Sequence, residues 1–101
     1  MNEQSLPSIA LPSRLTIELV SSVLAELQAS LTRMDAACVS LDAAHLHDFD
    51  TSAVAVLLEL RRHQMVRGRA LDIVNWPERL TSLVRLYGVD GLLGVSPVPT
   101  A

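Results

Sequence analysis

Apolar residues recur along this chain with two periods, and their alternation predicts three strand and helix units. Three short apolar stretches read as strands: "SIAL", "ACVSLDA" and "ALDIVN". Between and after them, apolar residues return at steps of three and four, which indicates amphipathic helices. We therefore expect a helix from Thr16 to about Met34, a second from Thr51 to Arg67, and a third that begins beside Pro77.

Capping residues mark the ends of these helices. Thr16 is the expected N-cap of the first helix, and Gly68 stands where a left-handed residue commonly ends a helix. Asn75 and Glu78 resemble a capping box at the start of the third helix, which Gly88 closes. We expect "VDGLLG", which follows, to form a short apolar turn.

Strands that alternate with helices predict an α/β domain, because parallel strands need crossover connections. We expect a central, mostly parallel sheet with helices packed on it. A chain of 101 residues has room for one hydrophobic core, so we predict a single domain over 1–101. Its core covers about 9–93, and 94–101 forms a frayed tail.

Composition excludes several classes of protein. The eight basic residues are all Arg and form no basic run, and the net charge is −3, which disfavours nucleic-acid binding. Cys38 is the only cysteine, so the chain forms no internal disulfide, and the cytoplasm is the expected compartment. No apolar run approaches the roughly 20 residues that span a bilayer, so we expect no direct membrane insertion.

Polar residues concentrate in "HLHDFDTS", which could in principle hold a metal ion. His45, His47, Asp48 and Asp50 offer suitable nitrogen and oxygen ligands. However, ligands crowded into one short segment rarely complete a tetrahedron without a distant ligand, and the chain has no second His or Cys cluster. We therefore expect no metal and no cofactor.

Catalysis is a second possible role for this segment. Thr51 or Ser52 would need a base such as His47 or His63 within hydrogen-bond distance, and a third group to orient that base. The chain contains neither a nucleophile elbow nor a phosphate-binding glycine loop. We expect a protein that is not an enzyme.

The segment also lies where the second strand ends and the second helix begins. Asp50 or Thr51 is expected to cap that helix, but capping explains only one polar residue. Four polar residues at one edge predict a surface that a partner protein recognises, or a hydroxyl that is modified. These four residues are Asp48, Asp50, Thr51 and Ser52.

The second helix is apolar on more than one side, which exceeds the usual stripe of a surface helix. One set is assigned to the sheet: Val54, Leu57, Leu58 and Met65. The other lies roughly opposite: Ala53, Val56 and Leu60. Two explanations remain open for this second set, which is covered by a neighbouring helix or forms half of a protein interface.

The stretches "CVSLDAAHLHDFDTSAVAVLLEL", "RGRALDIVN" and "PERLTSLVRLYGVDGLL" together resemble the STAS domain family, the fold of anti-sigma factor antagonists. The D-[ST] pair at Asp50 and Thr51 is the best-defined motif. Within the family, this pair and "LYGVDGLL" are most similar to the MlaB group, the STAS subunits of Mla phospholipid ABC transporters.

This resemblance implies a cytoplasmic, non-enzymatic subunit that binds the transporter's ATPase subunit and is peripheral to the inner membrane. The alternative that it implies is an anti-sigma factor antagonist, phosphorylated at Thr51 by an anti-sigma factor kinase. Two features depart from the family. Ala53 replaces a common glycine, and the segment before "SIAL" is too short for a full first hairpin.

Overall fold

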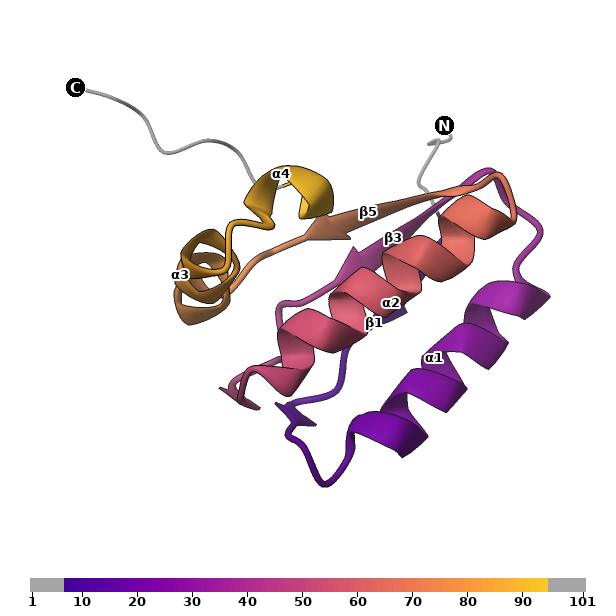
Figure 1. Ribbon diagram of the computed structural model, residues 1–101. Coiled ribbons are helices and arrows are strands. Elements are labelled where there is room, and N and C mark those ends of the chain that lie inside the picture. Colours follow the sequence, from indigo (N-terminus) through magenta and orange to yellow (C-terminus); the bar gives the residue numbers. More distant parts are fainter. Residues whose placement is uncertain (1–6, 95–101) are drawn as a thin grey trace, which may run out of the picture.

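A computed structural model, which describes residues 7–94, shows an α/β fold built on a parallel sheet (Figure 1). The strand order is β1-β3-β5, and both pairings are parallel. Leu41 lies opposite Ile9 on one side and Ile73 on the other, so one apolar row crosses the sheet. The strands are β1 (Ser8–Ala10), β3 (Cys38–Asp42) and β5 (Ala70–Val74).

Within residues 7–94, four helices accompany the sheet, and α2 lies centrally among them (Figure 1). On one side α2 packs against α1, and on the other it contacts the α3 and α4 pair. The helices are α1 (Val20–Arg33), α2 (Ser52–Val66), α3 (Glu78–Leu86) and α4 (Asp90–Leu93). Among the described residues, none of these helices is long and apolar enough to cross a membrane.

A second, smaller strand pair joins the start of α1 to the start of α2. It consists of β2 (Arg14–Leu15) and β4 (Asp48–Phe49), which run parallel. Leu15 and Phe49 are buried, while Arg14 and Asp48 face solvent. The sequence does not predict this pair, because two residues are too few to show a period.

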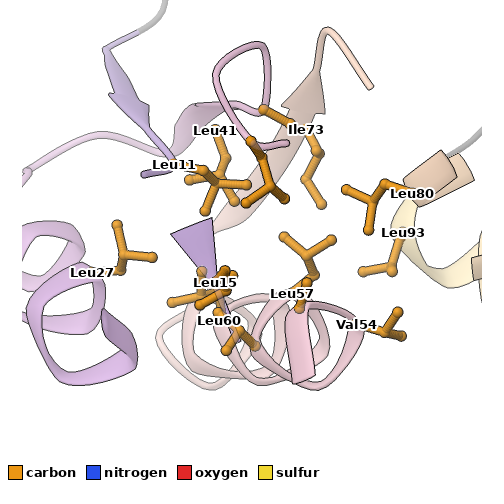
Figure 2. Packing of buried hydrophobic residues seen from close by; sticks show 14 of the residues in the cluster. Leu11, Leu15, Leu27, Leu41, Val54, Leu57, Leu60, Ile73, Leu80 and Leu93 are labelled. Atoms are coloured by element: carbon orange, nitrogen blue, oxygen red, sulfur yellow. The ribbon is translucent and has the colours of Figure 1, made fainter. Parts of the chain in front are cut away.

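The core lies between the sheet and the helices and is almost entirely aliphatic (Figure 2). Leu41 and Ile73 come from the sheet, Leu57 and Leu60 from α2, and Leu15 from β2. Toward α3 and α4, buried Leu93 of α4 extends the core beside Leu80 (Figure 2).

The structure confirms the α/β class and all three predicted strands, but it corrects two helix starts. The first helix begins at Val20, not at Thr16, whose hydroxyl instead donates a hydrogen bond to Glu18. The third helix has Pro77 as its N-cap, and Asn75 makes no capping bond. Asn75 adopts a left-handed φ of 58°, and its amide donates to Asp42.

The short apolar turn predicted at "VDGLLG" is a helix, α4. The second helix matches its prediction to within one residue at each end. Residues 1–6 and 95–101 lie outside the described part of the chain. The predicted frayed tail, apart from Gly94, and any leading strand therefore fall outside it as well.

The structure decides between the two explanations left open for the second apolar set of α2, because this set is covered within the domain and does not face a partner. Ala53, Val56 and Leu60 are at most 1% exposed and belong to the core. Met65, which was assigned to the sheet, is instead 55% exposed. A buried polar residue explains this error. Gln64 is fully buried and continues the buried stripe of α2, so the apolar pattern of the sequence does not show which side of the helix faces the core.

Candidate partner-binding site

The turn before α2 is anchored at Phe49. Phe49 is buried, and the Arg79 guanidinium of α3 lies 4.5 Å from the centre of its ring. Arg79 also donates hydrogen bonds to the carbonyls of His47 and Phe49. On the other side of the turn, Arg14 Nε lies 2.8 Å from Asp48 Oδ2 in an exposed ion pair. The segment that leads to α2 is thus held from both sides.

Asp50 supplies the hydrogen bonds that start α2. Its Oδ1 accepts the backbone amide of Ser52 at 2.9 Å, and its Oδ2 accepts the amide of Ile17 at 3.0 Å. The amide of Ser52 is the main reason that the pKa of Asp50 is below its usual value, with a further contribution from Ile17. Asp50 therefore remains ionised, caps α2 and ties it to the segment before α1.

Thr51 is the residue of the polar group whose side chain is left free. It is exposed, and as the backbone N-cap of α2 it makes no capping hydrogen bond with its side chain. Ser52, in contrast, is only 8% exposed, so its predicted role as a partner contact is wrong. Of the four polar residues, Thr51 has the hydroxyl that a partner or a kinase could reach.

An apolar groove begins beside Thr51. It encloses about 340 Å³ between α2 and the segment that joins α3 to α4. Its lining residues are Thr51, Val54, Ala55, Leu58, Tyr87 and Val89. Apart from the Thr51 hydroxyl and the Tyr87 phenol, these side chains offer only carbon to a ligand, so the groove suits an apolar group.

The sequence did not predict this groove. Tyr87 follows Leu80, Leu83 and Val84 in the apolar spacing of α3, which favours burial, yet it is 54% exposed. A signal was present in α2, because Ala55 and Leu58 follow Thr51 by four and seven residues and so share its side of the helix. The opposite wall of the groove, formed by Tyr87 and Val89, could not be predicted from the sequence.

The other candidate chemistry is not assembled around Thr51. His63 lies twelve residues further along α2, about 18 Å at 1.5 Å per residue, and its ring contacts Thr32 of α1. His47 Nδ1 lies 3.2 Å from the carbonyl of His45. No group of three or more His, Cys, Asp or Glu side chains suited to a metal ion occurs within residues 7–94.

Comparison with known families gives a match to the model described as "Mlab, STAS domain", over residues 3–94. The chain belongs to this STAS domain family. STAS families are generally regulatory or interaction domains, not enzymes. A search of curated protein sequences finds no match.

Solved structures of STAS domains have the same fold. The anti-sigma factor antagonist SpoIIAA, in its unphosphorylated form, is 11% identical with a TM-score of 0.64, over 95% of this chain and 96% of that one. The STAS domain of a SulP transporter from Vibrio cholerae is 16% identical with a TM-score of 0.69, over 97% of this chain and 77% of that one. At these identities the likeness shows a STAS fold and leaves the partner open.

Proposed function

We propose that this chain is the STAS subunit of an Mla-type phospholipid ABC transporter, which maintains the lipid asymmetry of the outer membrane. In this role it binds the ATPase subunit in the cytoplasm and is peripheral to the inner membrane through that contact. It supports the ATPase and catalyses no reaction itself.

One observation supports this proposal above all. The exposed hydroxyl of Thr51 stands at the mouth of an apolar groove and takes no part in capping α2. A domain that used Thr51 only for its own stability would show a capping bond there, since Thr is a good N-cap. With Asp50 as the cap, Thr51 is available to a partner. The match to a family described as "Mlab, STAS domain" favours the transporter ATPase as that partner.

A second function uses the same residue. The fold of SpoIIAA, an anti-sigma factor antagonist, covers almost the whole chain. In that role, an anti-sigma factor kinase would transfer phosphate to Thr51, which is exposed. Incubation with such a kinase and ATP, followed by mass spectrometry, distinguishes this function by a phosphate on Thr51.

The test of the proposed function is co-purification with a candidate ATPase subunit from the same genome. Thr51→Glu should abolish the contact, because it places a carboxylate at the mouth of an apolar groove. The melting temperature should barely change, since an acidic residue near a helix N-terminus contributes only about 0.3–1 kcal/mol. Ser21→Glu is the matched control, because it also replaces a hydroxyl with a carboxylate, at an exposed site in the first turn of α1.

The control should bind as the wild type does. If Thr51→Glu also co-purifies with the ATPase at the wild-type level, Thr51 is not part of the contact. If the wild-type chain fails to bind the ATPase at all, the transporter assignment is wrong.

A further inference from the structure

Ile17, in the turn between β2 and α1, lies beside Thr51. In the parallel pair of β2 and β4, Leu15 stands opposite Phe49. The same register, continued for two residues, brings Ile17 alongside Thr51. The backbone amide of Ile17 also donates a hydrogen bond to Asp50 Oδ2 at 3.0 Å. Since neighbouring strands lie about 4.8 Å apart, Ile17 and Thr51 are close neighbours on the surface.

The side chain of Ile17 is 64% exposed, although it is aliphatic. Single exposed apolar residues are common, so exposure alone would not mark a contact. Ile17 differs because its backbone is held by the same carboxylate that starts α2, since Asp50 Oδ1 accepts the amide of Ser52 at 2.9 Å. One side chain thus fixes Ile17 relative to Thr51, and a surface that is already ordered loses less entropy when it binds.

The carboxylates in the two segments that meet here are engaged within the chain. Asp48 pairs with Arg14 at 2.8 Å, and Glu18 accepts the Thr16 hydroxyl at 2.9 Å. Asp50 accepts two backbone amides. A partner therefore needs no cation at this place and gains most from apolar contact.

We propose that Ile17 is a further contact residue for the partner, which covers Thr51 with an uncharged, apolar surface that reaches from Ile17 to the groove. This inference rests on the proposed function, because it describes the surface of the ATPase subunit that meets Thr51. Ile17 contributes by losing its remaining contact with water in the complex. A carboxylate between two apolar contacts would be desolvated without a partner, which agrees with the expected effect of Thr51→Glu.

Methyl NMR of the wild-type chain tests this contact. The sequence contains three isoleucines, so a sample labelled at the isoleucine δ-methyl groups gives three signals. A soluble gadolinium chelate should relax the Ile17 signal strongly in the free chain, because this side chain is exposed, and much less in the complex with the ATPase subunit. Ile73 is 6% exposed, so its signal is the internal control and should stay protected in both states.

Two matched truncations measure how much Ile17 contributes. Ile17→Ala should weaken binding of the ATPase subunit about tenfold, as expected when an interface loses part of an aliphatic side chain. Val66→Ala shortens another β-branched side chain, 75% exposed and about 22 Å along α2 from Thr51, and should bind as the wild type does. Both variants should melt close to the wild type, since both positions are exposed.

The outcomes separate this inference from the proposed function. If Ile17 is protected in the complex and Ile17→Ala alone weakens binding, both are supported. If the ATPase binds the wild type but the Ile17 methyl stays accessible, or Ile17→Ala binds as tightly as Val66→Ala, the Ile17 contact is wrong and the transporter assignment stands. If the ATPase does not bind the wild type, the transporter assignment is wrong and the Ile17 contact is wrong with it.

Discussion

Substitution of Leu60 tests whether this residue packs in the core, as the structure shows, or is presented by α2 to a partner. Its side chain is fully buried, and in the core it lies with Leu15 of β2 and Leu57 of α2 (Figure 2). Truncation to alanine removes buried methyl groups and leaves a cavity, which costs about 3 kcal/mol at such sites. For a domain of this size, 1 kcal/mol lowers the melting temperature by about 4–8 °C, so Leu60→Ala should melt about 12–24 °C lower.

Urea unfolding, monitored by circular dichroism, measures this cost. An unchanged slope of the free energy of unfolding against urea concentration would show that only stability has changed. Met65→Ala is the matched control, since it shortens a side chain of similar size on the same helix that is 55% exposed. It should change the free energy of unfolding by less than about 0.5 kcal/mol. If Leu60→Ala were as stable as Met65→Ala but lost the ATPase, Leu60 would face the partner and the packing described for α2 would be wrong.

Two further predictions concern ionisable residues. Asp50→Asn should lower the melting temperature, because the charged acceptor of the Ser52 and Ile17 amides is lost. The wild type should lose the same stability as pH falls through the lowered pKa of Asp50. Thermal melts at a series of pH values would detect this loss. The pKa of His63 is lowered by burial, then by Arg67 and Arg62, so the unfolded chain binds protons more readily. Stability should therefore fall as pH drops below about 6.5, and His63→Gln should flatten that part of the profile; an unchanged profile would contradict the assigned cause.

The strands and the central helix were predictable because local chemistry decides them. "CVSLD" and "ALDIV" are short apolar runs that form adjacent parallel strands of the sheet. Their residues pair in register, beginning with Cys38 opposite Ala70. The end of α2 was equally clear, since Gly68 adopts the left-handed φ of 70° expected after a helix. The resemblance to STAS domains singled out Asp50 and Thr51 as its best-defined motif, at the start of the second helix.

The side of α2 that faces the core was not predictable, because both sides of that helix are apolar and one buried position is polar. Gln64 is fully buried because its side chain is satisfied, with its amide donating to the carbonyl of Ala70 and its oxygen accepting from Arg67. Those partners come from β5 and from the C-cap of α2, so only the folded chain reveals them. The predicted start of α1 was wrong for a similar reason. The Thr16 hydroxyl donates a hydrogen bond to Glu18, and the helix begins at Val20.

The motif at Asp50 and Thr51 divides two tasks between adjacent residues, and this division shapes what modification of Thr51 could do. Asp50 accepts the amides that order the start of α2, so folding does not depend on the Thr51 hydroxyl. A phosphate on Thr51 would gain from the positive end of the helix and lose from the adjacent Asp50 carboxylate, two opposing effects on stability. At the mouth of the apolar groove no such compensation exists, because a partner would have to desolvate the phosphate to pack against Ala55 and Leu58. We therefore predict that charge at Thr51 would weaken docking to a partner and leave the fold largely intact.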